Sequence, residues 1–429
     1  MTPIRHIRRT LLSALAILGA GACSSTNTPV TQANTGGSDN TGGAGAGDSD
    51  SGRGLKAFSA PADPGPGGIL FAASGEVLAL NGYDFPPASA DAAAFVDGWQ
   101  VRFTRLLVTI DKIALSSNPD AQSDNQSVTG SVVAEVDGPW AIDLHRSDPS
   151  YLLGKGGAGE QAVPIASLSK QNKNGNQPFD TTGGTRYAFG FDTVDATYDA
   201  YNVNLDAPGL EDYDEMVQNQ CVVFYRGTAT FRGNKTDSNC YPVDRQSWPD
   251  VVNFTLCFKS PTSYINCQNP DNGSAPAFPN EEFERGIAFV SNSSVIGQVT
   301  IHTDHPFWDS VLHDSPAHFD QYAARAVGQD AGIPTVTLEM TKGVDYTDYT
   351  DALGKTLNWR YCITPPTDVH PQFTGAMRFD PQSVPHATNN DPSTGLRDYY
   401  DYATYDQSTQ GHLNSDGLCY IKRHYPSPN

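Results

Sequence analysis

Apolar and polar residues alternate along much of the chain, in the pattern of β-strands with one buried face. In the clearest run, 99–115, alternate positions from Trp99 to Phe103 share one face. The apolar phase slips between Ile110 and Ile113, which predicts a bulge or bend in this strand. Further strand-compatible runs lie at 69–80, 131–136, 140–144, 187–193, 201–205, 221–231, 251–258, 286–290 and 295–302.

Clusters of Gly, Pro, Asn and Asp separate these runs. Short strands at this spacing are typical of a β-sandwich or a barrel-like sandwich. We therefore expect a mainly β protein, with a β-sandwich-like domain over residues 69–305. A length of about 235 residues is within the range of one all-β domain.

The pattern changes after residue 305. Short helices are expected at 307–312 and 318–327, and one more strand at 335–340. Beyond residue 342 the chain is rich in Tyr and Asp and has few long apolar runs. We expect residues 306–429 to form an irregular, partly helical C-terminal extension that packs on the sandwich.

The N-terminus has the three parts of an export signal. Arg5, Arg8 and Arg9 supply positive charge ahead of the apolar run 11–18. That run is too short to span a bilayer, which takes about 20 apolar residues. Small residues then lead to Cys23.

The segment Leu18-Gly-Ala-Gly-Ala-Cys23 resembles the lipobox of bacterial lipoproteins, with Ala20 where Leu is usual. The resemblance implies that residues 1–22 are a removable signal peptide and that Cys23 carries a lipid anchor. Ser24, where Asp would resemble an inner-membrane retention signal, implies an outer-membrane lipoprotein of the cell envelope, facing the periplasm or the surface. The alternative is an ordinary secretory signal that leaves a free thiol.

Residues 24–54 are low in complexity and nearly free of large apolar side chains, so they cannot bury enough surface to fold. We expect 23–68 to be the lipidated Cys23 and a disordered tether rich in Gly, Ser and Pro. A flexible tether of about 45 residues has a mean reach of roughly 35–40 Å. The sequence has no second hydrophobic span, so the lipid is the expected membrane contact.

Besides Cys23 the chain has an even number of cysteines, and an exported chain meets an oxidising compartment. We therefore expect disulfide bonds. Cys257 and Cys267 are the one pair that looks local, because Pro-Thr-Ser between them can turn the chain back. No Cys-x-x-Cys pair is present, which argues against a zinc ribbon or a thioredoxin-like site. The disulfide candidates are Cys221, Cys240, Cys257, Cys267, Cys362 and Cys419.

The charge balance is acidic, with 27 basic and 48 acidic residues and a formal net charge of −21. Loss of the three arginines of the signal takes the mature chain to −24. A surface of this sign repels phosphate backbones, so no nucleic-acid partner is expected. It is compatible with cation binding.

Four of the ten histidines fall within 17 residues, and the densest part reads His302-Thr-Asp304-His305-Pro-Phe-Trp-Asp309. If a strand ends near His302, Asp304 points the same way and the following turn brings His305 round. Two imidazoles and a carboxylate suit one zinc, copper or non-haem iron ion. The candidate metal ligands are His302, Asp304, His305, Asp309, His313 and His318, with His145 and His412 as remote additions.

The same residues also fit a strand-to-helix junction without a metal. In that interpretation Asp304 caps a helix and the histidines form hydrogen bonds in a loop. No His-Glu-x-x-His signature is present. Acid–base catalysis without a metal is the weakest alternative, and no catalytic residue is assigned.

A second candidate combines Asp and Tyr at 345–351 and 397–406. Carboxylates two to three residues apart can share Ca²⁺, which takes about 6–8 oxygen ligands. Exposed Tyr faces beside Asp could instead stack on sugar rings. The remaining alternative is solvated loops whose tyrosines pack on the domain.

Three weaker motifs are assigned structural roles. The run from Gly154 to Gly159 matches Gly-x-Gly-x-x-Gly but opens no helix of a βαβ unit, so we expect a loop. Asp143 and His145 share a strand face without a Gly-x-Ser-x-Gly nucleophile elbow, so we expect packing rather than catalysis. Trp308 is expected to be a core anchor.

Segments 98–110, 142–145 and 299–309 resemble those of uncharacterised lipoproteins of myxobacteria and related bacteria. The resemblance extends over roughly residues 69–340 and implies the architecture, with no activity attached. In those proteins an acidic, EF-hand-like stretch follows the His-Asp-His segment. Residues 327–334 lack the ligand spacing of such a loop, so no EF-hand site is expected.

Together these features predict an outer-membrane-anchored exported lipoprotein that binds a metal ion or a glycan and is not an enzyme. One alternative is a metal-dependent envelope enzyme that uses His302, Asp304 and His305. Another is a structural or adhesive component with an envelope protein as its partner. The cofactor expected is one transition-metal ion (Zn, Cu or Fe) or Ca²⁺.

Overall fold

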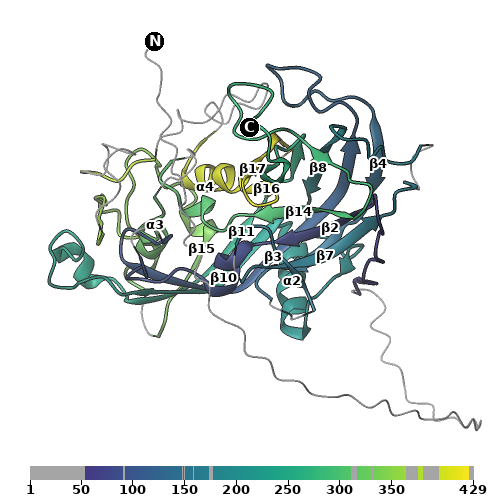
Figure 1. Cartoon of the computed structure of the whole chain (residues 1–429). Helices are drawn as coiled ribbons and strands as arrows, with labels where there is room; N and C mark the ends of the chain where they lie inside the picture. The colour runs from purple at the N-terminus through teal and green to yellow at the C-terminus, as the bar shows by residue number, and fades with distance from the viewer. Residues whose placement is uncertain are drawn as a thin grey trace, which may run out of the picture. The chain divides into compact units, whose positions relative to one another are not determined.

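The computed structural model describes residues 54–89, 92–146, 148, 150–157, 159–172, 177–310, 316–329, 332–363, 375–379 and 396–424. Over these residues the protein is mainly β, as predicted, and its strands form two mixed sheets (Figure 1). Within this part of the chain no helix is both long and apolar enough to cross a membrane. The predicted signal peptide, Cys23 and most of the predicted tether lie outside the described residues.

The larger sheet is built around the long strand β3 (Trp99–Ser116). Its order is β1 (Lys56–Ala57), β9 (Tyr201–Asn202), β5 (Trp140–Asp143), β3, β10 (Val223–Phe231), β11 (Val251–Phe258) and β15 (Thr335–Thr337). Strands β4 (Val132–Val136) and β8 (Arg186–Thr193) also pair with β3. Strands β12 (Thr262–Ile265) and β13 (Ile287–Ala288) pair with β8, and β18 (Tyr420–Arg423) pairs with β12.

The smaller sheet has the order β17 (Gly417–Leu418), β16 (Gly411–Leu413), β14 (Val295–Ile301), β2 (Ile69–Ser74), β7 (Gln161–Leu168) and β6 (Leu152–Leu153). Strands β14 and β2 are parallel, and β16 is antiparallel to β14. Segments far apart in the sequence therefore lie side by side at one end of this sheet. The C-terminal extension supplies strands to both sheets.

Residues from both sheets form one hydrophobic core. Phe71 of β2 and Phe189 of β8 meet within it, with ring centroids 6.2 Å apart. Along β3, Leu106 belongs to this core, whereas Leu107 packs with helix α2 (Ala207–Asn219). Successive strand side chains point to opposite faces, so β3 is covered on both sides. The predicted sandwich-like architecture is confirmed.

The predicted strand at 99–115 is confirmed together with its irregularity. The pairing of β3 with β8 shifts register between Asp111 and Ala114, and Lys112 has a φ of 46°. Such a positive φ is typical of an extra residue in a strand. Most of the shorter predicted strands are also present, but the 201–205 run forms only β9.

The strand expected over 69–80 is wrong in its second half. Strand β2 ends at Ser74, and helix α1 (Glu76–Asn81) follows and buries Ala79. Gly75 permits this turn, because a Cβ there would lie 2.6 Å from the Cβ of Ala79. A short apolar run does not distinguish strand from buried helix.

Residues after 305 follow the predictions less closely. The helix expected at 307–312 is wrong over its described residues, 307–310. The 3₁₀ turn η3 (His305–Phe307) ends at Phe307, and Trp308 is extended and forms a β-bridge with Ala317. The helix at 318–327 is present in shorter form as α3 (Asp320–Ala323) and η4 (Ala324–Ala326). The 335–340 run is β15 followed by η5 (Leu338–Thr341). Two further 3₁₀ turns are η1 (Val243–Ser247) and η2 (Pro270–Asn272).

Several short strands, the longer strand β7, and helices α2 and α4 (Tyr399–Gln407) were also not predicted. Helix α2 buries Gly209, Asp212, Tyr213 and Met216, so its inner face carries no continuous apolar stripe. Helix α4 is buried along most of its length and shows no amphipathic pattern. Residues 54–68, expected to end the tether, are part of the domain, where β1 pairs with β9.

The six predicted cysteines form three disulfide bonds, Cys221–Cys257, Cys240–Cys362 and Cys267–Cys419. The local pair Cys257–Cys267 is wrong. Strands β10 and β11 are antiparallel and pair Phe224 with Cys257. Cys221 lies just before β10, and its Cα is 5.3 Å from that of Cys257. The register of β10 and β11, rather than the turn between Cys257 and Cys267, therefore selects the partner of Cys257.

Candidate metal centre

The predicted ligands His302, Asp304 and His305 converge. One ligand atom from each lies within 4.8 Å of those of the other two. Strand β14 ends at Ile301, and Pro306 begins the turn η3 that bends the chain back. Zinc ligands lie about 2.0–2.2 Å from the ion, so an ion would need only a small closure of this group.

Helix capping does not account for the carboxylate. Asp304 occupies the N-cap position of η3, but its side chain makes no capping hydrogen bond. Its carbonyl oxygen accepts the bond from the Phe307 amide, at 2.8 Å. The alternative in which the Asp304 side chain caps a helix is therefore not observed.

Hydrogen bonding selects the nitrogen that His302 can offer to an ion. Its Nε2 lies 3.0 Å from the carbonyl oxygen of Ser415. A carbonyl only accepts, so in the neutral ring Nε2 carries the proton and Nδ1 carries the lone pair. Nδ1 is therefore the nitrogen whose lone pair His302 could offer to an ion.

The same reasoning applies to His305. The Thr409 hydroxyl donates its single hydrogen to the carbonyl of Asp406, at 2.7 Å. It must then accept from His305 Nδ1, which is 2.6 Å away. The lone pair of His305 lies on Nε2. Both imidazoles thus have a protein group on one nitrogen and a lone pair on the other, as metal-binding histidines do.

Other aromatic rings fix these imidazoles in place. His305 is buried and stacks on Trp308, with ring centroids 3.8 Å apart. His412 of β16, a remote candidate from the sequence, is also buried, and its ring centroid lies 4.3 Å from that of His302. Trp308 belongs to the hydrophobic core, as predicted.

Two further buried carboxylates, those of Asp309 and Asp406, interact with each other, and Asp406 also interacts with Asp304 of the centre. Burial raises the pKa of Asp309 to about 8. Burial also raises the pKa of Asp406 well above its usual range, and the nearby carboxylates of Asp309 and Asp304 raise it further, while Arg423 opposes the shift. Asp309 was a candidate ligand of this centre, whereas the sequence placed Asp406, now in α4, in the separate Asp- and Tyr-rich candidate at 397–406. Carboxylates gathered in a buried region favour a bound cation.

The remaining described candidates are not members of this converging group. His318 is buried against Trp359, with ring centroids 4.7 Å apart. It is not among the converging groups found in the described part of the chain, and neither is Asp309. His313 lies outside the described residues. Among the described ligand candidates from the His-rich segment, the converging group therefore consists of His302, Asp304 and His305.

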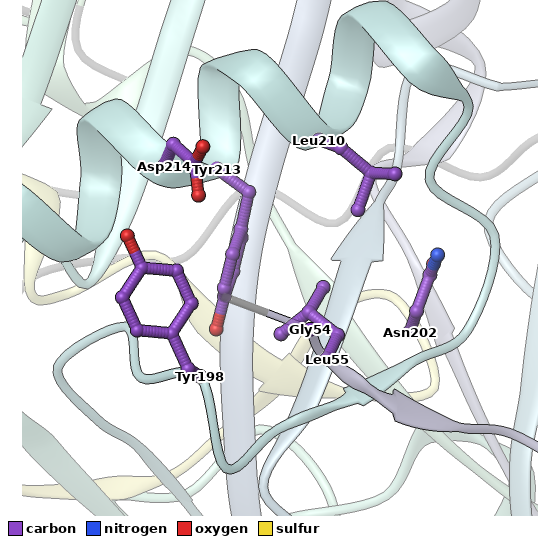
Figure 2. Close-up of a pocket in the computed structure, with 7 residues that line it drawn as sticks. All are labelled: Gly54, Leu55, Tyr198, Asn202, Leu210, Tyr213 and Asp214. Atoms are coloured by element: carbon purple, nitrogen blue, oxygen red, sulfur yellow. The ribbon is translucent and has the colours of Figure 1, made fainter. Parts of the chain in front are cut away.

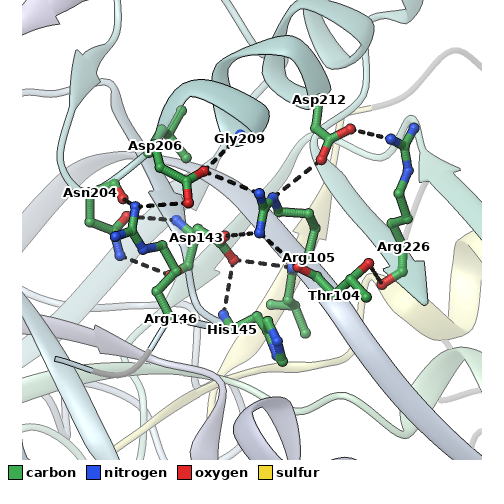
Figure 3. A network of polar contacts seen from close by, with 12 residues as sticks. Thr104, Arg105, Asp143, His145, Arg146, Asn204, Asp206, Gly209, Asp212 and Arg226 are labelled. Atoms are coloured by element: carbon green, nitrogen blue, oxygen red, sulfur yellow. Dashed lines mark hydrogen bonds and ion pairs between the residues drawn. The ribbon is translucent and has the colours of Figure 1, made fainter. Parts of the chain in front are cut away.

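His145 and Asp143 have structural roles. His145 Nδ1 bonds to the carbonyl of Ala79 at 2.7 Å, which ties β5 to helix α1. Asp143 is fully buried and accepts the backbone amides of Leu106 and His145. Figure 3 shows Asp143 within an ion network in which Arg105 also pairs with Asp206 and Asp212. The packing interpretation of this pair is supported.

A second group of converging ligand atoms shares His302. It consists of Glu76, His302 and Asp416, again within 4.8 Å of one another. Glu76 Oε1 lies 3.7 Å from His302 Nε2. Sequence reasoning missed Glu76 because it was placed in a continuous strand.

The tyrosines of helix α4 are not the exposed rings that the glycan-binding alternative requires. Tyr399, Tyr402 and Tyr405 of α4 are buried in the core. The Asp345 carboxylate accepts from its own turn at Thr347, and that of Asp351 from the backbone of residues 353 and 355. The alternative in which the tyrosines pack on the domain is the one observed for α4.

The Gly-rich motif and the surface pocket hold no part of the candidate centre. The described residues between Gly154 and Gly159 form a loop between β6 and β7, as predicted. The pocket in Figure 2 lies beside α2 and is lined by Leu55, Tyr198 and Tyr213, among others. None of its lining residues belongs to either converging group.

Comparisons with known proteins give no relatives: no family model, no curated protein and no solved structure matches the chain.

Proposed function

We propose that this protein binds one transition-metal ion through His302 Nδ1, a carboxylate oxygen of Asp304 and His305 Nε2. The convergence of these three groups carries the proposal. The hydrogen bonds that His302 donates to the Ser415 carbonyl and His305 donates to the Thr409 hydroxyl support it, because they set the tautomer of each ring. Two imidazoles and one carboxylate favour zinc, copper or iron over calcium.

Metal content of the tag-free mature protein with intact disulfides tests the proposal. After loading with Zn²⁺, Cu²⁺ or Fe²⁺ and dialysis, about one equivalent of one of these metals should remain, and less than about 0.2 equivalents of each would overturn the proposal. The double variant His302→Gln/His305→Gln should lose the ion. His424→Gln is the control, because His424 is exposed and its ring bonds to the Ser263 hydroxyl, away from the candidate centre.

Urea unfolding of the metal-free proteins separates binding from folding. The double variant should unfold close to the wild type when both lack metal, and only the wild type should gain stability on addition of metal. Ligand present at about 100 times its Kd stabilises a protein by about 2.7 kcal/mol. A double variant that fails to fold without metal would favour the structural interpretation.

A second candidate function is metal-dependent hydrolysis in the cell envelope. Three protein ligands leave one position of a tetrahedral ion for water, as in catalytic zinc sites. The zinc-loaded protein should then release p-nitrophenol from p-nitrophenyl acetate or bis-p-nitrophenyl phosphate, and the double variant should not. Equal rates for the two proteins would rule out hydrolysis at this centre and leave metal binding as its proposed function.

We also propose that the mature chain is exported and anchored through a lipid on Cys23. The three disulfides support this, since disulfides persist in oxidising compartments. Mass spectrometry of the N-terminal peptide should find a diacylglyceryl group on Cys23. An unmodified Cys23 in a chain that stays in the cytosol would refute the proposal.

A further inference from the structure

Glu76 reaches the candidate centre from a strained position. It is the first residue of α1, and its φ of 60° is in the left-handed region that residues other than Gly rarely adopt. Its amide is held by the Ser74 hydroxyl at 2.9 Å. Strain of this kind persists only where the surroundings impose it, and it clusters at functional sites.

Ser415 connects Glu76 to His302. The Ser415 hydroxyl donates to Glu76 Oε1 at 2.7 Å, and its carbonyl accepts from His302 Nε2 at 3.0 Å. Ser415 also has a positive φ, 77°, as does its neighbour Asn414, at 51°. This is the turn between β16 and β17, where Gly would be the easier residue. A Ser in that place supplies the hydroxyl that Gly lacks.

Groups from two other segments, Glu76 and Ser415, thus lie close to Nε2 of His302. Glu76 follows β2, His302 follows β14, and Ser415 follows β16, and these strands are neighbours in the smaller sheet. The Ser415 amide donates to the Thr300 hydroxyl at 3.0 Å, which fixes the turn against β14. The side chains of Glu76 and His302 are 16% and 12% exposed, so solvent only partly screens the carboxylate at 3.7 Å.

We propose that Glu76 is a positioning residue of the metal centre: through Ser415 it holds the imidazole of His302 in the tautomer that offers Nδ1 to the ion. This inference rests on the proposed metal site and adds the group that tunes it. Outer carboxylates of this kind set the ring orientation and raise the basicity of the ligand nitrogen. The converging group of Glu76, His302 and Asp416 is then an orienting arrangement and not a second ion site.

Metal affinity of the full mature protein tests the proposal with Co²⁺ and Zn²⁺ as probes. Glu76→Gln should weaken binding about 10–100-fold, the range found for outer-shell changes. Ser415→Gly, which suits the turn but removes the hydroxyl, should weaken it by less. Asp345→Asn is the control, because Asp345 is exposed, accepts from the amide of Thr347 in its own turn and belongs to neither converging group, so this variant should bind as the wild type does. Equal loss in Glu76→Gln and Asp416→Asn, with anomalous scattering that places the ion between these two side chains, would overturn the proposal.

The tautomer can be measured without any metal, which separates this inference from the proposed function. In the metal-free wild type, ¹⁵N NMR should find the proton of His302 on Nε2. Glu76→Gly removes the carboxylate while suiting the left-handed backbone, so the fold is kept. In this variant the Nδ1-protonated form should appear. A wild type protonated on Nδ1, or no change of tautomer and affinity in either Glu76 variant, would refute the role of Glu76.

Discussion

Replacing Asp309 by Asn should stabilise the metal-free protein, and the gain should grow with pH. The Asp309 side chain is buried, and burial raises its pKa from 3.8 to about 8. The amides of Asp309 and Ser310 oppose this shift but do not cancel it. An Asn amide has nearly the same shape and cannot ionise, so it avoids the cost of burying a charge.

The sign and size of the effect follow from the two pKa values. Below about pH 4 the carboxyl is protonated in both the folded and the unfolded chain, so it contributes no pH dependence. Between about pH 4 and about pH 8 only the unfolded chain has lost the proton, so the free energy of unfolding falls by about 1.4 kcal/mol per pH unit. At pH 7 the accumulated loss is about 4 kcal/mol, and above about pH 8 it levels off. Asp309→Asn should recover that amount.

Urea unfolding of the EDTA-treated wild type and variant at pH 5, 7 and 9 would measure the gain. The expected gain is about 1.6 kcal/mol at pH 5 and about 4 kcal/mol at pH 7. Asp345→Asn is the control, because Asp345 is exposed and hydrogen bonds to Thr347 lower its pKa, so it should show no gain. A gain for Asp309→Asn that is the same at every pH would refute the reasoning.

Two further predictions concern the fold. Removing Cys267–Cys419 by a double Ala substitution should lower the free energy of unfolding by about 5 kcal/mol, and removing Cys221–Cys257 should lower it by about 4 kcal/mol, because the closed loops span 152 and 36 residues. Urea titration of both variants measures the two losses, and a larger loss for the shorter loop would contradict the prediction. Asp206→Ala should cost about 1–2 kcal/mol, since Asp206 caps α2 through the Gly209 amide at 2.8 Å. Amide exchange should rise in the first turn of α2, and Asp206→Asn, which keeps the cap, should show little change.

Local patterns were enough for the strands and for part of the site. The alternation in β3 and β11 follows from a side-chain period of two, which is visible in sequence wherever one face is buried. The bulge near Lys112 was visible for the same reason, as a break in phase. His302, Asp304 and His305 are close in sequence, so a strand end and a proline turn are sufficient to bring them together.

Features without a local period were not predictable. Helix α2 buries Asp212 and helix α4 buries Tyr and Asp together, so neither shows an apolar stripe. The disulfide partners are 36 to 152 residues apart, and strand register decides which sulfurs meet. The expected Cys257–Cys267 pair failed because it relied on nearness in sequence.

The amino-acid sequence by itself determined the mainly β character of the chain and the His-Asp-His segment, because both depend on neighbours within a few residues. Only the tertiary structure decided that Glu76, Asp406, His412 and Ser415 surround that segment. Strand β14 pairs with β2 and β16, which come from opposite ends of the chain. The groups that select each lone pair and set the local charge therefore arrive through long-range packing, and no short-range pattern records them.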